Sequence, residues 1–387
     1  MRRIVLLTLG ILLLATGVRL VFPPDVAAAS SGKIIYSFGG GTDGAYPESD
    51  LIMDAAGNLY GTTNQGGTGC GSAGCGTVFE LIRSKDGWKH QVLYSFAGGT
   101  DGVFPTAGLV FDCVGNLYGT TADGGSNCGD GGCGTVFKLS PNSHGAWTES
   151  VLYSFTGSNG DGAYPNTDLV FDSKGNLYGT TPGGDTGLGV VFKLSPNSGG
   201  TWTESTVYSF QGPPHDGAFP IGGLLLDSGG NLYGATEGGG NGGNAVCYGG
   251  SMGGINGCGA VFKLTPISGG GWRETVLYNF FRGQGFAKRP SGGLILENPD
   301  QILGTTSVGG DGDGAFFRLH QTKKGWEQNL LYRFYGDPDG RNPVGRLAQG
   351  PGARFMAQPQ TGGTPPITAE QFSRSNRSMA NGRSGCC

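Results

Sequence analysis

The sequence has little charge and little histidine. Only 14 % of its 387 residues are charged, the net charge is −4, and Lys and Arg form no basic block. These properties argue against nucleic acid as a partner, because nucleic-acid-binding proteins present a basic face. Neither a metalloprotease motif nor a phosphate-binding loop is present, so we predict no cofactor. The four histidines stand at unrelated points of the chain, at His90, His144, His215 and His320.

One long apolar run exists, at the N-terminus. Arg2 and Arg3 precede it, it covers residues 4–18, and three Ala at 27–29 follow before Ser30. This arrangement is typical of a secretory signal peptide over residues 1–29. The alternative is a membrane anchor, but the run is shorter than the roughly 20 apolar residues that a bilayer requires. We therefore expect export to the periplasm, the cell surface or the medium, with no membrane span after signal cleavage.

Glycine is abundant instead, at 80 residues, but without the Gly-X-Y period of collagen. The glycines separate short runs of Val, Leu, Tyr and Phe, which predicts many turns joining many strands. One seven-residue stretch, Gly-Asn-Leu-Tyr-Gly-Thr-Thr, recurs along the chain. Its copies lie at 57–63, 115–121, 175–181 and 230–236, with a divergent copy at 301–306.

Each repeat carries four strand-like runs, in the order Tyr-Ser-Phe, Gly-Leu-Val-Phe-Asp, Asn-Leu-Tyr-Gly-Thr-Thr and Gly-Thr-Val-Phe-Lys-Leu. Four short strands per repeat are typical of a β-propeller blade. The sequence therefore predicts an all-β propeller domain over residues 30–347, with five complete blades and part of a sixth, and six or seven blades in the intact ancestor. The Tyr of the first run lies at positions 36, 94, 153, 208, 278 and 332.

A tryptophan recurs just before the Tyr-Ser-Phe run. Such a row could form a platform on which sugar rings stack, or it could pack between blades, and we favour packing. The five residues are Trp88, Trp147, Trp202, Trp272 and Trp326.

Two sets of aspartates recur. Asp54, Asp112, Asp172 and Asp227 stand between the second and third runs. We predict that they form turns, because Asp bonds its own backbone. The other set precedes Gly after the first run, with a Pro three residues beyond. A ring of these carboxylates on one rim could hold Ca²⁺ or a sugar, whereas the favoured alternative is a turn of fixed geometry. The candidate ligand-binding residues are Asp43, Asp101, Asp161, Asp216 and Asp339.

The cysteines predict disulfides in the connection between the third and fourth runs. In an exported protein, each close pair predicts one disulfide that staples its loop. A zinc site would require closer spacing and a second ligand pair nearby, so we predict no metal. The pairs are Cys70 with Cys75, Cys128 with Cys133, and Cys247 with Cys258, while Cys113, Cys386 and Cys387 remain unassigned.

The fourth repeat contains an insertion over residues 241–257. It includes a Gly-x-Ser-x-Gly match at 249–253, which lacks the preceding strand and following helix of a nucleophile elbow. The divergent fifth repeat adds Arg282, Lys288 and Arg289. Neither segment combines an acid, a base and a nucleophile, so we predict no catalytic residue.

The repeat pattern ends after residue 347. Residues 348–387 are polar and aperiodic, which predicts an irregular, disordered tail. One restored nucleotide before Met356 would encode Phe-Tyr-Gly-Thr-Thr, the third-run motif, where it is due. We therefore expect the tail to be a frameshift product, which makes a truncated, non-functional gene product one interpretation of the chain.

The recurrence of all these motifs together resembles the GloVer repeat, found in choice-of-anchor tandem-repeat proteins of bacteria such as Gloeobacter and Verrucomicrobia. The resemblance covers about residues 34–347. It implies a bacterial, exported, surface-associated protein and supplies no catalytic residues. We predict a non-catalytic binding or cell-surface scaffold module, with carbohydrate or a surface protein as partner. The alternative is a secreted carbohydrate-active enzyme, a glycosidase or lyase, which would require two carboxylates at a fixed separation.

Overall fold

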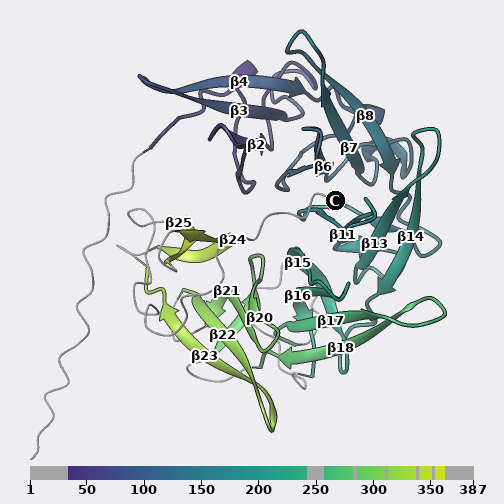
Figure 1. Cartoon of the computed structure of the whole chain (residues 1–387), viewed down its shortest axis with the longest axis vertical. Helices are drawn as coiled ribbons and strands as arrows, with labels where there is room; N and C mark the ends of the chain where they lie inside the picture. The colour runs from purple at the N-terminus through teal and green to yellow at the C-terminus, as the bar shows by residue number, and fades with distance from the viewer. Residues whose placement is uncertain are drawn as a thin grey trace, which may run out of the picture.

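The computed structural model describes residues 34–241, 257–281, 286–309, 313–336, 340–350 and 354–361. Antiparallel sheets stand around a central axis, each with its first strand near the axis and its last strand at the periphery (Figure 1). This arrangement is a β-propeller, which confirms the predicted fold class.

Five sheets, which we call blades 1 to 5, have four strand positions each. In blade 5 the first position is divided between two short strands, β19 and β20, which both pair with β21. In chain order the blades are β1 (Ile52–Met53), β2 (Leu59–Thr63), β3 (Thr77–Ser84), β4 (Gly87–Ser95); β5 (Val110–Phe111), β6 (Leu117–Thr121), β7 (Thr135–Pro141), β8 (Trp147–Ser154); β10 (Val170–Phe171), β11 (Leu177–Thr181), β13 (Val190–Pro196), β14 (Trp202–Ser209); β15 (Gly217–Leu226), β16 (Leu232–Gly239), β17 (Ala260–Pro266), β18 (Trp272–Asn279); and β19 (Ala287–Pro290), β20 (Ile295–Asn298), β21 (Gln301–Gly309), β22 (Ala315–Thr322), β23 (Gly325–Arg333).

The sequence analysis placed the Tyr-Ser-Phe run as the first strand of each blade, and this prediction was wrong. The Tyr-Ser-Phe run is the fourth, outermost strand of the preceding blade, as Tyr94 in β4 shows by pairing with Val78 in β3. The reason is loop length, because a short turn at residues 85–86 keeps β3 and β4 together. The loop that carries Asp-Gly is longer and therefore crosses from one blade to the next.

Neighbouring blades are held together by an apolar cluster that repeats around the ring. Between blades 1 and 2, Val78 and Phe96 of blade 1 pack with Leu109 and Phe137 of blade 2, and all four are buried. Burial of one such side chain contributes roughly 1.5–3 kcal/mol, which explains why the strands are apolar on both faces. The contact of a fourth-strand Phe with the next blade's third-strand Phe recurs at Phe96–Phe137, Phe155–Phe192, Phe210–Phe262 and Phe280–Phe317.

Four of the five tryptophans pack between blades, in agreement with the favoured prediction. Trp202 is partly buried, with its ring centroid 6.3 Å from that of Tyr118 in the preceding blade. Trp272 lies in the same way 6.0 Å from Tyr178. These positions leave the tryptophans as parts of the blade interfaces.

A glycine at the start of each third strand allows the next blade to approach. Gly134 has φ +91°, and a Cβ built on it would lie 2.5 Å from Cδ of Pro165 in the next blade. The same contact joins Gly76 to Pro105 and Gly189 to Pro220. The Gly of the Gly-Thr-Val-Phe run and the Pro that follows Asp-Gly are therefore two halves of one contact.

The turn between the first two strands of a blade depends on aspartate, as predicted. Oδ1 of Asp112 accepts hydrogen bonds from the backbone N–H groups of Val114 and Asn116, at 3.0 and 2.9 Å. Its Oδ2 accepts from Nδ2 of Asn116 and from the Tyr118 hydroxyl. These donors hold the pKa of Asp112 below its usual value despite burial. Asp54, Asp172 and Asp227 make the same contacts.

Two further strands, β24 (Arg341–Gly350) and β25 (Arg354–Thr361), form a two-stranded sheet that follows blade 5 in the ring (Figure 1). Residues 341–350 and 354–361 are strands, although the sequence predicts an irregular tail from residue 348. The pairing continues because a strand edge beside the propeller presents unpaired N–H and C=O groups that a following segment can satisfy.

The remaining predictions about the chain ends concern residues outside those described. The expected signal peptide lies within residues 1–33, and residues 362–387 hold the rest of the tail. Over the described ranges, no helix has the length and apolar character needed to cross a membrane.

Candidate functional site

One end of the blades carries the two kinds of loop that the motifs single out. In an antiparallel blade, the loop from the fourth strand to the next blade and the loop between the second and third strands lie at the same end. The first kind carries Asp-Gly, and the second carries the cysteine pairs. We call this end the loop rim, and it contains the predicted site residues that the structure describes.

The Asp-Gly carboxylates are bound within their own loops. Oδ1 of Asp101 accepts a hydrogen bond from the Tyr94 hydroxyl at 2.7 Å, and Oδ2 accepts from the backbone N–H of Ala97 at 2.5 Å. Asp161 and Asp216 bond the equivalent groups. Each aspartate therefore links the fourth strand of one blade to the loop that leads into the next. Asp339 lies outside the described residues.

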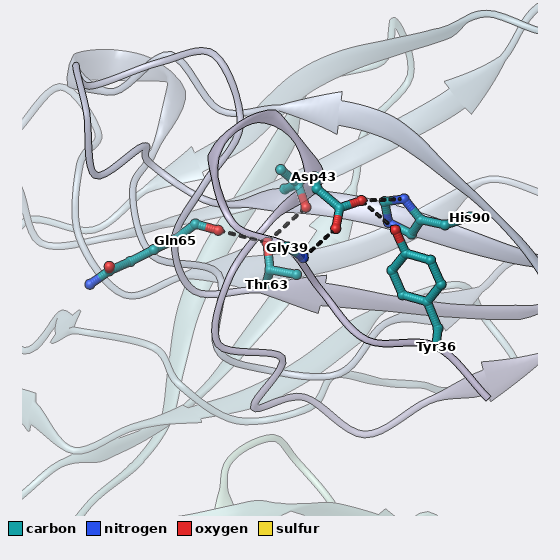
Figure 2. Close-up of polar contacts among 7 residues, drawn as sticks. Tyr36, Gly39, Asp43, Thr63, Gln65 and His90 are labelled. Atoms are coloured by element: carbon teal, nitrogen blue, oxygen red, sulfur yellow. Dashed lines mark hydrogen bonds and ion pairs between the residues drawn. The ribbon is translucent and has the colours of Figure 1, made fainter. Parts of the chain in front are cut away.

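Figure 2 shows the first of these loops. Asp43 accepts from the Tyr36 hydroxyl at 2.5 Å and from the backbone N–H of Gly39 at 2.6 Å. It also lies 3.0 Å from Nδ1 of His90, and burial lowers the pKa of that imidazole. Nε2 of His90 is buried without a hydrogen-bond partner among the described residues. The imidazole is stacked on Tyr36 with a centroid separation of 4.6 Å, so it forms part of the packing.

The last threonine of the Gly-Asn-Leu-Tyr-Gly-Thr-Thr motif lies close to the glycine of Asp-Gly and leaves no room for a side chain there. Oγ1 of Thr63 lies 2.8 Å from Oγ1 of Thr77 and donates to the Gln65 carbonyl (Figure 2). A Cβ on Gly44 would lie 2.7 Å from the Thr63 hydroxyl oxygen. A side chain at Gly44 would clash with Thr63, and Gly102 approaches Thr121 in the same way in the next blade.

A second carboxyl group faces three of the aspartates. Glu149 in β8 is buried at its Oε1, which has no hydrogen-bond partner within the described ranges. Burial, with a further contribution from Asp101, raises the pKa of Glu149 to about 8. In the same way, burial with Asp161 raises the pKa of Glu204 to about 7, and burial with Asp216 raises that of Glu274 to about 7. Burial thus favours the protonated form of each of these glutamates.

Blade 5 differs at both members of the pair. Phe286 stands in the register position of the aspartate, and Gln328 stands in that of the glutamate. Oε1 of Gln328 accepts a hydrogen bond from the backbone N–H of Ala287 at 3.2 Å. Blade 5 thus has neither carboxyl group, whereas blade 1 keeps Asp43 and has His90 in the register position of the glutamate.

Two of the predicted disulfides are present. Cys70 and Cys75 have Cα atoms 5.3 Å apart, and those of Cys128 and Cys133 are 5.5 Å apart. A Cβ on Gly98 would lie 2.6 Å from the Cys70 sulfur, so the disulfide packs directly on the next Asp-Gly loop. Cys113 and Cys258 each take part in a disulfide as well. Cys247, the predicted partner of Cys258, lies outside the described residues.

An aromatic residue that we did not single out in the sequence stands at the same rim position in four repeats. It immediately precedes the Pro of each Asp-Gly loop and has a positive φ between 57° and 62°, which is uncommon for a bulky side chain. Tyr46 is 63 % exposed and Tyr164 is 48 % exposed, while the other two are partly buried. The pattern Asp-Gly-x-aromatic-Pro was the available signal. The residues are Tyr46, Phe104, Tyr164 and Phe219.

The preceding blade holds this backbone conformation. The N–H of Phe104 donates to the Cys75 carbonyl at 3.0 Å, and that of Tyr164 donates to the Cys133 carbonyl at 2.8 Å. The disulfide-stapled loops therefore position the aromatic side chains of the next blade.

At the fifth repeat, Arg289 takes the place of the aromatic residue. It forms an ion pair with Glu237 of blade 4, and burial lowers the pKa of the guanidinium. Arg282 and the Gly-x-Ser-x-Gly match lie outside the described residues. Among the residues that the structure places, no three His, Cys, Asp or Glu side chains are grouped to hold a metal ion.

Comparison with known proteins identifies one matching family and several solved structures of similar fold. A model of the Gloeobacter/Verrucomicrobia repeat matches residues 21–248, and no curated protein matches the chain. An ancestral GH74 enzyme has a similar structure, with TM-score 0.52 and 10 % identity over 86 % of this chain and 43 % of its own. A protein of unknown function from Dyadobacter fermentans reaches TM-score 0.44 and 13 % identity, over 84 % of this chain and 92 % of its own. At such identities, the likeness extends to the fold alone.

Proposed function

The chain belongs to the Gloeobacter/Verrucomicrobia repeat family, and membership of this family implies no particular reaction. We propose that the protein is an exported, non-catalytic binding module whose loop rim binds carbohydrate. The observation that carries the proposal is the aromatic side chain held in left-handed backbone geometry in four successive repeats. Backbone strain of this kind costs of order 1–3 kcal/mol at each position, and such residues cluster at functional sites.

The exposed aromatics supply what a sugar ring requires. The apolar C–H face of a pyranose packs on an aromatic ring, and a Tyr hydroxyl adds a polar contact at the edge. Tyr46 and Tyr164 are the most exposed of the set. Because the Asp-Gly carboxylates already accept hydrogen bonds from their own loops, we assign them the support of this surface.

The proposed compartment has a separate basis. Two disulfides on the rim indicate an oxidising environment, outside the cytoplasm. The N-terminal segment with Arg2, Arg3 and an apolar run supports export by the secretory route.

The test is binding of labelled bacterial and plant oligosaccharides to the purified protein on a glycan array, followed by calorimetry with the best ligand. Tyr164→Ala should weaken binding at least tenfold. Tyr164→Phe should retain it, because Phe104 and Phe219 occupy the equivalent positions. Thermal unfolding of both variants checks that the fold is kept. Equal affinity of the Ala variant, or no glycan binding at all, would contradict the proposal.

A carbohydrate-active enzyme is the alternative function. The same oligosaccharides, incubated with the protein and assayed for new reducing ends, separate the two functions. Turnover that disappears in Glu149→Gln or Asp101→Asn would favour the enzyme, because a glycosidase needs a general acid of raised pKa, as Glu149 has, and a second carboxyl group.

A further inference from the structure

Blade 1 exposes apolar side chains that the other blades bury. Leu51, next to β1, is 46 % exposed, and Met53 in β1 is 66 % exposed. The same face of each later blade is covered by the blade before it. The residues equivalent to Leu51 are only 1–5 % exposed, at Leu109, Leu169, Leu224 and Leu294.

Residues 36–38 lie against blade 1 in the position of a fourth strand from a preceding blade. The Tyr36 hydroxyl donates to Asp43, as Tyr94 does to Asp101. The rings of Phe38 and Phe79 meet edge-on with centroids 4.9 Å apart, and this contact matches the 5.1 Å contact of the same type between blades 1 and 2. The N-terminal segment therefore supplies the outermost strand position of the sixth blade.

A third strand is the element that this blade lacks among the described residues. β24 and β25 occupy its first two positions, and no described strand is hydrogen-bonded to residues 34–38. In every other blade the fourth strand pairs with a third strand. Within the described ranges, the edge of residues 34–38 thus has no strand beside it, and such an edge can accept one.

The other interfaces show which side chains cover such a face. The third strand of the preceding blade contributes one valine to each interface cluster, where it packs with the leucine equivalent to Leu51. Val78 lies in the cluster of Leu109, and Val136 lies in that of Leu169. Val191 and Val261 repeat the arrangement with Leu224 and Leu294.

We propose that the surface formed by residues 34–38, Leu51 and Met53 binds an extended strand with the third-strand sequence pattern Thr-Val-Phe-x-Leu, donated by a partner polypeptide. Backbone hydrogen bonds to residues 34–38 provide affinity, and the valine packed on Leu51 provides specificity, as in other cases of strand addition. The bound strand closes the ring.

The test uses the purified protein and a fluorescent peptide, Gly-Thr-Val-Phe-Lys-Leu-Ser-Pro, which copies residues 134–141. Fluorescence anisotropy should show saturable binding of one peptide per protein, and the midpoint of thermal unfolding should rise with peptide concentration. A control peptide with Asp in place of Val should bind at least tenfold more weakly.

A matched pair of variants locates the binding surface. Leu51→Asp should reduce affinity at least tenfold, whereas Val114→Asp, at a 79 % exposed position in a turn, should not. Circular dichroism of both variants reports the fold. Absence of binding by a monomer, as judged by light scattering, would overturn the proposal, because the chain's own residues would then cover the face. A dimer that Leu51→Asp dissociates would also overturn it, in favour of a second copy.

Discussion

Replacing Glu149, Glu204 and Glu274 with Gln should make the stability of the propeller less dependent on pH between 5 and 8. In the folded protein, burial first and the neighbouring aspartate second raise the three pKa values to about 8, 7 and 7, from 4.5. The folded state therefore binds more protons than the unfolded state above pH 4.5. The contribution of these three groups to stability is therefore greatest below that pH, falls as the pH rises through this window, and is lost above about pH 8.

The magnitude follows from the shifts. A tenfold change in proton affinity corresponds to about 1.4 kcal/mol, which gives ceilings of about 5 kcal/mol for Glu149 and about 3 kcal/mol for each of the others. Their side chains are partly exposed, and solvent screening reduces each contribution to roughly 1 kcal/mol. The three contributions add to roughly 3 kcal/mol. Between pH 5 and pH 8, the free energy of unfolding of the unmodified protein should therefore fall by roughly 3 kcal/mol more than that of the triple Gln variant.

The assay is urea unfolding followed by Trp fluorescence at pH 5, 6, 7 and 8. Gln fits the position, because Gln328 stands there in blade 5. His90 titrates with the opposite sign, since its pKa is lowered, but it is unchanged in both proteins and cancels in their difference. Glu48→Gln, at an exposed position, should behave as the unmodified protein. Equal pH dependence of the triple variant and the unmodified protein would refute the reasoning.

Two further predictions concern the blade contacts. Gly134→Ala should destabilise the protein by about 2–4 kcal/mol, because its Cβ would meet Pro165 at 2.5 Å. The control Gly145→Ala, with φ +80° but no atom within 4 Å, should destabilise it by only about 1–2 kcal/mol. Urea unfolding measures both values. Replacing Cys128 and Cys133 with Ser should lower the free energy of unfolding by roughly 2 kcal/mol, the loop-closure value for six residues. A reducing agent should then destabilise the variant less than the unmodified protein. An equal effect on both proteins would contradict the disulfide assignment.

The propeller itself was predictable because one unit is repeated several times, so each motif confirms the others. Two of the predicted disulfides and the Asp112-type turns follow from local chemistry and were predicted correctly. The blade boundary was not, since a strand's partner depends on loop length and sheet contacts that no single run of residues encodes. The Tyr-Ser-Phe run was consequently assigned to the wrong blade.

The rim was harder to predict for a different reason. The repeated Asp-Gly was visible, but its role depends on hydrogen bonds from the Tyr94 hydroxyl and the Ala97 N–H, which the motif alone does not reveal. Likewise, the aromatic before each Pro resembled an ordinary core residue. Only the backbone geometry of Tyr164 and its 48 % exposure distinguish it from the buried aromatics of the strands.

The hydrogen bond from Phe104 to the Cys75 carbonyl has a consequence for the shape of the rim. Blade 2 supports the conformation of Tyr164, and blade 3 supports that of Phe219 through the Leu188 carbonyl. Each of these blades thus supports the loop of its successor. Because the loop rim is built in this way, a defect in one blade should alter the rim of the next.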